Sequence, residues 1–287
     1  MNHPDYNSPA ALKSFLAGAG MAVHKQFGQN FLINAKARAR LVRALSLSAG
    51  MTVWEIGPGL GAMTECILKT GARLTVFEID RGFAAALKEF FATEYTRGQL
   101  TVVTGDVLKT WHKEYARTGP PDCFFGNLPY NSAATLIAST IEHSVRFSRC
   151  VVTVQKEVAE RLCAAVGTAA YSSLSILCQW AYSVRPVMDL AGGNFWPRPR
   201  VDSRAVVLTP RADFPRCKNP PLFMRLQRAL FLSRRKNIRN NLTAFLGNGD
   251  AAARALTLAG IDPQLRPEAV PIETLLQLSD CLNDAIL

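Results

Sequence analysis

Between residues 51 and 210, short apolar segments rich in strand-forming residues alternate with stretches whose apolar residues recur at helical spacing. Strands are predicted over 51–57, 73–79, 100–106, 122–127, 149–155, 184–190 and 204–210. Helices are predicted over 62–70, 81–91, 132–143, 156–165 and 172–182. This alternation predicts an α/β fold, an open and mostly parallel sheet with helices on both faces.

The two ends of the chain have a different character. Residues 220–287 contain four or five short helical stretches separated by glycine and proline turns, and no strand pattern follows Pro210. We therefore expect a sheet domain over 25–210 and a smaller all-helical domain over 211–287. Residues 1–24 are only weakly periodic, with one helical turn near 10–16, and predict a mobile extension.

The composition argues against a membrane protein, a secreted protein and a metal site. Apolar residues make up 48% of the 287 residues, so a sizeable core can form, yet no apolar run approaches the ~18 residues of a membrane span. The N-terminus lacks the charged-then-apolar pattern of a secretory signal. Seven cysteines stand singly and four histidines are scattered, which indicates reduced thiols in a cytoplasmic protein without a metal site.

Nearly all of the net charge of +11 is concentrated in one span. Residues 190–240 hold twelve lysines and arginines against two aspartates, Asp202 and Asp213, a net charge of +10. A solvated surface is the ordinary explanation, but the concentration favours a polyanionic partner, with nucleic acid ahead of an acidic membrane. Six candidates for RNA contact are Arg198, Arg200, Arg234, Arg235, Lys236 and Arg239.

The segment EIGPGLGAMTE, residues 55–65, leaves a predicted strand and enters a predicted helix. Its glycines permit a tight turn and let a ligand approach the backbone, as in a nucleotide-binding loop. Gly57, Gly59 and Ala62 also satisfy the pattern G-x-G-x-x-A, so a dinucleotide site stays open at this point. No Lys-Ser or Lys-Thr pair follows, which argues against a phosphate-binding P-loop.

Acidic side chains end the next two strands. Glu78 lies 21 residues after Gly57, where a carboxylate can accept hydrogen bonds from both ribose hydroxyls. Asp80 competes for that role but also suits a helix N-cap. Asp106 follows the third strand and can accept from an adenine amine, or act as a cap. Ligands bind at the carboxyl ends of parallel strands, so these residues predict a cofactor site there.

The stretch FFGNLPYN, residues 124–131, ends the fourth strand. The side-chain oxygen of Asn127 and the backbone carbonyl of Leu128 can accept from an exocyclic amine and draw electron density back onto its nitrogen. Pro129 keeps a backbone donor out of the pocket, and Tyr130 offers a stacking face. An ordinary strand-to-helix turn is the alternative, but it leaves the Pro-Tyr pair unexplained.

Together these motifs resemble the S-adenosylmethionine-dependent methyltransferases that modify adenine N6. The closest resemblance is to the small-subunit ribosomal RNA adenine dimethyltransferases, the kasugamycin-sensitivity enzymes. Further markers are KQFGQNFL (25–32), VQKEVAERL (from 154), FWPRPRVDS (195–203) and SRRKNIRNNL (233–242). The resemblance implies a Rossmann-like methyltransferase sheet and double methylation of two adjacent adenosines near the 3′ end of small-subunit rRNA in the immature subunit. We expect the protein to be a monomer.

The resemblance also implies roles for particular residues. Asn30 and Leu32 would close over S-adenosylmethionine from the N-terminal side. The family's other cofactor positions correspond to Gly57, Glu78, Asp106 and Asn127. Its target-base motif corresponds to Asn127, Pro129 and Tyr130, with Phe195 stacking on the adenine opposite Tyr130. A family segment with a glycine after its tyrosine reads Tyr171-Ser172 here, so that turn is expected to differ.

Three alternatives remain open on the sequence. An erythromycin-resistance-type enzyme, acting on large-subunit rRNA, shares the QNF and Asn-x-Pro-aromatic motifs. A non-catalytic assembly factor could use the same fold to bind RNA. A dehydrogenase would use the glycine loop but leave the Asn-Leu-Pro-Tyr motif and the basic span without a purpose.

Overall fold

The structure, a computed structural model, describes residues 3–23, 29–127 and 130–286. The elements that precede and build the first half of the main sheet are α1 (Pro9–Gly18), β1 (Phe31–Leu32), α2 (Ala35–Leu45), β2 (Thr52–Ile56), α3 (Ala62–Leu68), β3 (Arg73–Glu78), α4 (Arg81–Phe90), α5 (Ala92–Thr96), β4 (Leu100–Thr104), α6 (Val107–Thr118) and β5 (Cys123–Asn127). The second half comprises α7 (Tyr130–Glu142), β6 (Arg149–Gln155), α8 (Lys156–Leu162), α9 (Ser173–Ala181), β7 (Tyr182–Leu190), β8 (Phe195–Trp196) and β9 (Ser203–Pro210). Four C-terminal helices follow, α10 (Pro220–Leu230), α11 (Ile238–Leu246), α12 (Gly249–Leu258) and α13 (Ile272–Ile286).

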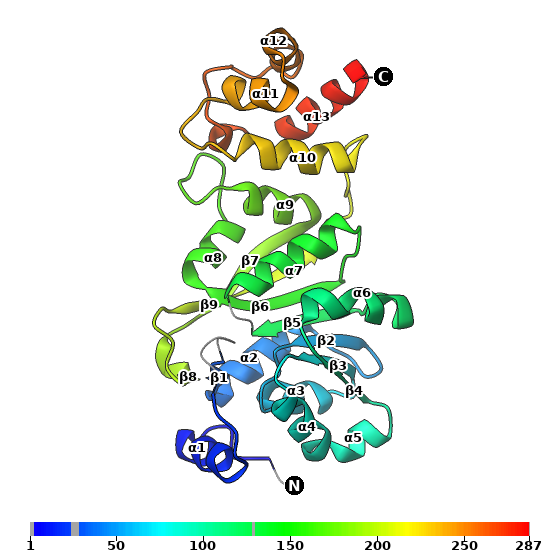
Figure 1. Cartoon of the computed structure of the whole chain (residues 1–287), viewed down its shortest axis with the longest axis vertical. Coiled ribbons are helices and arrows are strands. Elements are labelled where there is room, and N and C mark those ends of the chain that lie inside the picture. The colour runs from blue at the N-terminus through cyan, green and yellow to red at the C-terminus, as the bar shows by residue number, and fades with distance from the viewer. Residues whose placement is uncertain (1–2, 24–28, 128–129, 287) are drawn as a thin grey trace. The chain divides into compact units, whose positions relative to one another are not determined.

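Seven strands form the main sheet in the order β4-β3-β2-β5-β6-β9-β7. The five strands β2 to β6 run parallel, and β9 is antiparallel to β6. The predicted α/β class with an open, mostly parallel sheet is therefore confirmed (Figure 1). Because parallel strands all end at the same edge, Ile56, Glu78, Thr104 and Asn127 bring their following loops together there.

Apolar contacts on both faces explain why the strands are continuous apolar runs. On one face, the Trp54 ring packs edge-on to Phe77 and tilted against Phe147, with ring centroids 5.1 and 6.0 Å apart. On the other face, Val53 joins a core cluster with Leu41 and Leu45 of α2. Strands covered on both faces have no side that water can reach, so they do not alternate apolar with polar residues.

Helix α6 is an element that sequence analysis did not predict. Asp106 is its N-cap, and the Asp106 side chain accepts from the Leu108 N–H. Its buried residues Val107, Trp111 and Glu114 recur at helical spacing. The signal was present, but charged residues between these positions diluted it.

The N-terminal segment is packed, where a mobile extension was expected. Helix α1 is capped by the Ser8 side chain, with Pro9 in its first turn. Leu12 and Leu16 on its inner face are buried, as is Tyr6 before it. The segment up to residue 23 thus packs into a small apolar cluster that it shares with Phe31, Leu60 and Phe83.

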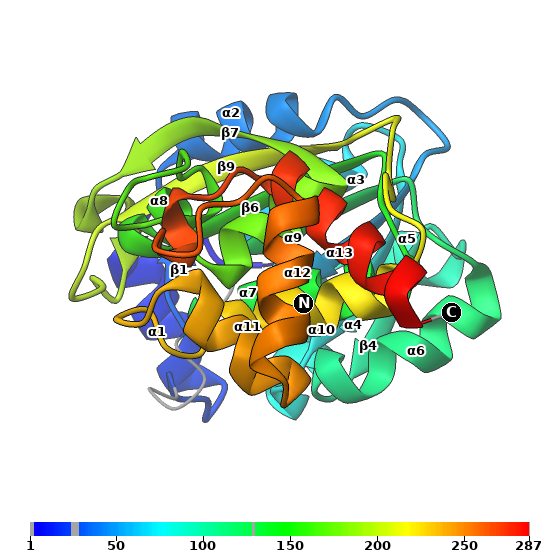
Figure 2. The ribbon, with the colours of Figure 1, turned by 90° about the horizontal axis from the view of Figure 1, so that it is seen from above.

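The chain divides into two compact units, and each unit is built from three separate segments of the sequence. Unit 1 consists of residues 1–137, 146–159 and 185–209, and unit 2 of residues 138–145, 160–184 and 210–287. Residues 210–287 thus belong to the same unit as two segments that lie before them in the sequence, 138–145 and 160–184. In unit 2, α10 to α13 pack against one another, and Figure 2 shows them crossing. None of the described helices is long and apolar enough to cross a membrane.

Candidate active site

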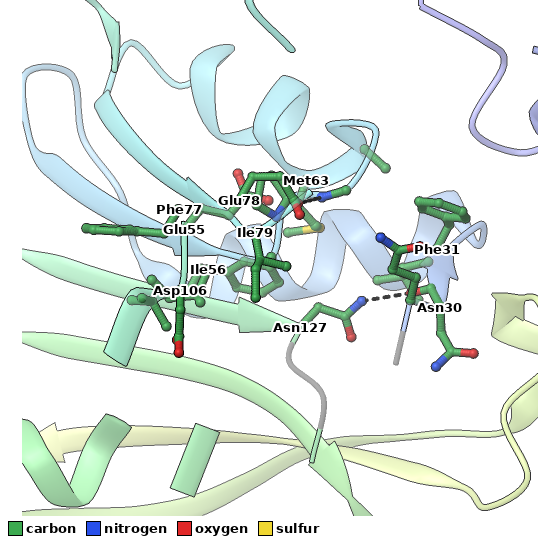
Figure 3. A pocket seen from close by; sticks show the side chains of 18 of the residues that line it. Asn30, Phe31, Glu55, Ile56, Met63, Phe77, Glu78, Ile79, Asp106 and Asn127 are labelled. Atoms are coloured by element: carbon green, nitrogen blue, oxygen red, sulfur yellow. Dashed lines mark hydrogen bonds between the residues drawn. The ribbon is translucent and has the colours of Figure 1, made fainter. Parts of the chain in front are cut away.

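A cavity of about 250 Å³ opens at the carboxyl ends of β2, β3 and β5, all within unit 1 (Figure 3). Its walls come from the segment before and within β1, the glycine loop after β2, and the loops after β3, β4 and β5. All six residues predicted to contact the cofactor line this one cavity: Asn30, Leu32, Gly57, Glu78, Asp106 and Asn127. Residues up to 97 positions apart therefore converge at the sheet edge that the strand pattern indicated.

The glycine loop requires glycine at three positions. Gly57, Gly59 and Gly61 have φ angles of 66°, 57° and 91°, in the region that side chains with a Cβ rarely adopt. A Cβ on Gly59 would also lie 2.9 Å from the Phe31 ring. The Phe31 ring of β1 thus packs against the glycine loop, and the loop forms part of the cavity wall.

Glu78 holds the glycine loop from the neighbouring strand. One carboxylate oxygen accepts from the Gly59 N–H at 3.0 Å and the other from the Asp80 N–H at 2.9 Å. Burial raises the pKa of Glu78 to about 7, against the backbone hydrogen bonds that lower it. Each oxygen keeps a further lone pair, so two ribose hydroxyls can still donate to this carboxylate. Asp80 is the N-cap of α4, accepting from Gly82 and Phe83, which confirms its alternative reading.

Asp106 caps a helix and also lies at the cavity. One side-chain oxygen accepts from the Leu108 N–H at 3.0 Å and so caps α6. The residue also lines the cavity, with Val107 and Leu108 beside it. The cap fixes the side chain at the cavity edge, and its second oxygen is the group that could accept from an adenine amine.

Glu55 is a cavity residue that sequence analysis did not single out. It is 1% exposed and accepts from the Thr64 hydroxyl at 2.7 Å. Burial raises the pKa of its carboxyl to about 8; the Thr64 hydrogen bond opposes this shift and the charge of Glu78 adds to it. The available signal was a lone acid within the apolar strand TVWEI. Two buried carboxylates facing one cavity suit a cationic ligand, because a cation compensates the cost of ionising them.

Apolar side chains give the cavity a flat portion. Ile79 follows Glu78 and is 44% exposed, an unusual state for an isoleucine, and Figure 3 shows its side chain reaching into the cavity. Val107 and Leu108 line the wall formed by the start of α6. Such surfaces can pack against a planar ring while Asp106 accepts a hydrogen bond from the edge of that ring.

The side-chain amide of Asn127 is oriented by the chain itself. Its Nδ2 donates to the Asn30 carbonyl at 3.2 Å, the dashed line between labelled residues in Figure 3. Only the nitrogen can donate to a carbonyl, so the Oδ1 faces away from Asn30 and is left as an acceptor. Leu128 and Pro129 lie outside the described residues, as does the side chain of Tyr130, which begins α7.

The Phe195 side chain is buried, so its ring does not present a face to a ligand. Its strand β8 pairs antiparallel with β1, so that Phe195 stands opposite Leu32 and Trp196 opposite Phe31. Phe195 is 5% exposed and belongs to the main core cluster with Leu32. A ring that stacks on a base must present a face, so the predicted role would require this side chain to move. Trp196 instead is half-buried and stacks on Phe31, with centroids 6.1 Å apart.

The six basic candidates for RNA contact are all exposed, two in unit 1 and four in unit 2. Arg234 also donates to the Ala169 carbonyl at 2.7 Å. Other cations of the basic span are neutralised in ion pairs with carboxylates, so its effective charge is below +10. These cations are Arg204, Arg211, Arg216, Lys218 and Arg228.

The fold and cavity define a class of enzyme. A dinucleotide-binding Rossmann sheet keeps its strands parallel in the order 3-2-1-4-5-6, whereas here the antiparallel β9 separates β6 from β7. This sheet, the glycine loop and the acidic residues around the cavity are those of an S-adenosylmethionine-dependent methyltransferase. Residues 20–284 match the model of the ribosomal RNA adenine dimethylase family, and the chain belongs to that family.

Similar proteins agree with this assignment. The chain is 45% identical to the ribosomal RNA small subunit methyltransferase A of Treponema denticola, over 99% of this chain and 97% of the relative. It is 36% identical to the protein of that name from Borreliella burgdorferi, over 97% and 95%. Among solved structures, a dimethyladenosine transferase from Plasmodium falciparum has a TM-score of 0.71 at 25% identity, covering 85% of this chain and 94% of that one. The 23S rRNA methyltransferase ErmE has a TM-score of 0.64 at 23% identity, covering 88% and 99%.

Proposed function

We propose that this protein methylates N6 of two adjacent adenosines near the 3′ end of small-subunit rRNA, each of them twice. The family assignment and the names of relatives 45% identical over nearly the whole chain support this substrate. The observation that carries the chemistry is the amide of Asn127, whose nitrogen donates to the Asn30 carbonyl, so that its oxygen points away from that carbonyl at the cavity.

A hydrogen-bond acceptor beside the target amine helps the reaction, because the amine is a poor nucleophile. The lone pair of an adenine amine is delocalised into the ring, which makes the amine a poor nucleophile. S-adenosylmethionine supplies an electrophilic methyl group on a sulfonium sulfur. The Asn127 oxygen accepts from one amine N–H, and this interaction strengthens as positive charge develops on the nitrogen. No strong base is required, because the proton can leave after the amine has become cationic.

In this proposal each part of the cofactor has a position among the cavity residues. Glu78 takes the ribose hydroxyls, since its two oxygens are already held apart by backbone donors. Asp106 accepts a hydrogen bond from the edge of the adenine ring, and Ile79 packs against the face of that ring. Glu55 is the buried carboxylate that faces the cationic portion. Two buried acids with raised pKa values beside a backbone loop of glycines fit a cationic nucleoside better than an anionic dinucleotide.

The remaining roles concern the RNA. Pro129, Tyr130 and Phe195 complete the target-base site in this proposal, with Phe195 turning out of the core to stack. The exposed cations bind the phosphates of rRNA in the immature small subunit: Arg198, Arg200, Arg234, Arg235, Lys236 and Arg239. The protein acts as a monomer in the cytoplasm.

A large-subunit enzyme of the erythromycin-resistance type is the second candidate. The ErmE structure is 23% identical, a level at which likeness supports the fold alone. The names of the curated relatives favour the small subunit. Offering unmodified small and large subunits separately to the enzyme distinguishes the two.

The direct test compares Asn127→Ala with Gln99→Ala at saturating S-adenosylmethionine. Gln99 is a matched control, because its amide also donates to backbone carbonyls, those of Leu68 and Ala72, away from the cavity. Asn127→Ala should lower kcat by about 100-fold or more, the scale of losing one aimed polar group, while RNA affinity changes little because phosphate contacts dominate it. Methyl incorporation is mapped by digestion and mass spectrometry. Equal turnover of the two variants would remove Asn127 from the mechanism, and no incorporation by the wild type would favour a binding protein.

A further inference from the structure

The segment before the cavity, residues 3–23, packs onto the cavity wall rather than standing apart from it. Tyr6, Leu12 and Leu16 form one apolar cluster with Leu60 of the glycine loop and Phe31 of β1. Figure 1 shows α1 beside β1 at the blue end of the chain. Both partners continue into cavity residues, since Phe31 and Gly59 line the cavity.

The first specific contact is on the glycine loop. The Tyr6 hydroxyl donates to the Leu60 carbonyl at 2.8 Å, and both residues are buried. Burial raises the pKa of Tyr6, which keeps the hydroxyl protonated and able to donate. Leu60 lies between Gly59 and Gly61, two residues in left-handed conformations. The Tyr6 hydroxyl therefore holds the loop backbone between two glycines, in addition to the Glu78 carboxylate that holds Gly59.

The second contact is on β1, through a buried cation. Arg38 of α2 is 5% exposed, and among the described residues it forms no ion pair with a carboxylate. Its Nη1 donates to the Leu32 carbonyl and its Nη2 to the Asn7 side-chain oxygen, each at 2.7 Å. A buried guanidinium needs its acceptors, so Asn7 is bound to the same group that holds the cavity residue Leu32.

We infer that residues 3–23 form a brace that positions the glycine loop and β1 for S-adenosylmethionine, with Tyr6 and Asn7 as its positioning residues. The inference rests on the proposed placement of the cofactor in this cavity. Neither side chain lines the cavity, so each acts through the backbone it holds. If the loop visits other conformers when released, the apparent affinity falls with the fraction of molecules that remain competent to bind.

The test uses the full-length protein and the variants Tyr6→Phe, Asn7→Ala and Tyr95→Phe. Tyr6→Phe removes one hydroxyl and keeps the ring that stacks on His3. Tyr95 is the matched control, 41% exposed and away from the cavity. The measurements are the Kd for S-adenosylmethionine by calorimetry, KM for cofactor and for RNA, kcat, and hydrogen exchange over residues 57–63.

Tyr6→Phe and Asn7→Ala should each raise Kd and KM for S-adenosylmethionine by roughly two- to tenfold, the range set by one buried hydrogen bond. We expect kcat at saturating cofactor and KM for RNA to stay at wild-type values. Exchange should quicken over 57–63 and return to the wild-type rate when cofactor saturates the site. Tyr95→Phe should change none of these.

Two outcomes separate the inference from the function on which it rests. A wild-type protein that does not bind S-adenosylmethionine would overturn the proposed function. A wild type that binds, with both variants binding equally tightly even if they melt at lower temperature, would show that the segment only stabilises the fold. A uniform rise of exchange throughout unit 1 would lead to the same conclusion.

Discussion

Glu55 should couple cofactor binding to pH. Its pKa is about 8 in the free protein, chiefly because of burial, so at pH 7 the carboxyl is mostly protonated. For a cation placed about 5 Å from this carboxyl, in the cavity that Glu55 lines, Coulomb's law sets the size of the effect. At an effective dielectric constant of about 20, the attraction is about 3 kcal/mol, which lowers the pKa by about two units to ~6.

The sign follows from these two values. Because the pKa is lower in the complex than in the free protein, binding releases a proton and affinity rises with pH. Wild-type Kd should fall about 25-fold between pH 6 and pH 8, with about 0.8 proton released at pH 7. Glu55→Gln keeps an acceptor for Thr64 but cannot ionise, so it should bind about twofold more weakly than wild type at pH 6 and about 50-fold more weakly at pH 8.

Calorimetry in buffers of different ionisation enthalpy measures both the affinity and the released proton. The α-amino group of the ligand itself titrates near pH 8, so the ratio of the two Kd values is the diagnostic quantity. S-adenosylhomocysteine, which lacks the sulfonium charge, shows whether the sulfonium or the ammonium group is the partner. A ratio that stays constant from pH 6 to pH 8 would refute the reasoning.

Two other substitutions test the loop and the basic span. Gly59→Ala places a methyl group 2.9 Å from the Phe31 ring at a φ of 57°, and should weaken S-adenosylmethionine binding at least tenfold in a titration, the scale of a strained backbone position; unchanged affinity would mean that the loop adapts. Reversing the charges of Arg234, Arg235 and Lys236 should weaken RNA binding and flatten its dependence on salt, while cofactor affinity is retained. An RNA salt slope equal to that of wild type would make this cluster a solvated surface.

Several elements could be predicted from the sequence because their signals are local. Strand β6 was predicted over 149–155 and lies there, since an apolar run of that length between turn residues has few alternatives. Ser172, where the related segment has glycine, begins α9 through a reciprocal capping box with Ser175. Helix α6 was missed although its buried residues recur at helical spacing, because charged residues lie between them.

Other features depend on partners far away in the chain. No local pattern marks Arg38 as buried, yet it is 5% exposed and donates to Asn7 and to the Leu32 carbonyl. Phe195 reads as an exposed aromatic beside prolines, yet pairing of β8 with β1 turns it into the core. The N-terminal segment has a weak pattern in sequence because its apolar face is short. That face is buried against Leu60 and Phe31, which are distant in the chain.

The sequence by itself determined the sheet class, the glycine turn and the row of polar residues that end the parallel strands. These follow from side-chain period, from backbone sterics and from the rule that parallel strands end at one edge. Tertiary structure decided which carboxylates are desolvated, as with Glu55, and how a side-chain amide is oriented, as with Asn127. Burial and hydrogen-bond pairing depend on residues that are distant in sequence, and no local period carries that information.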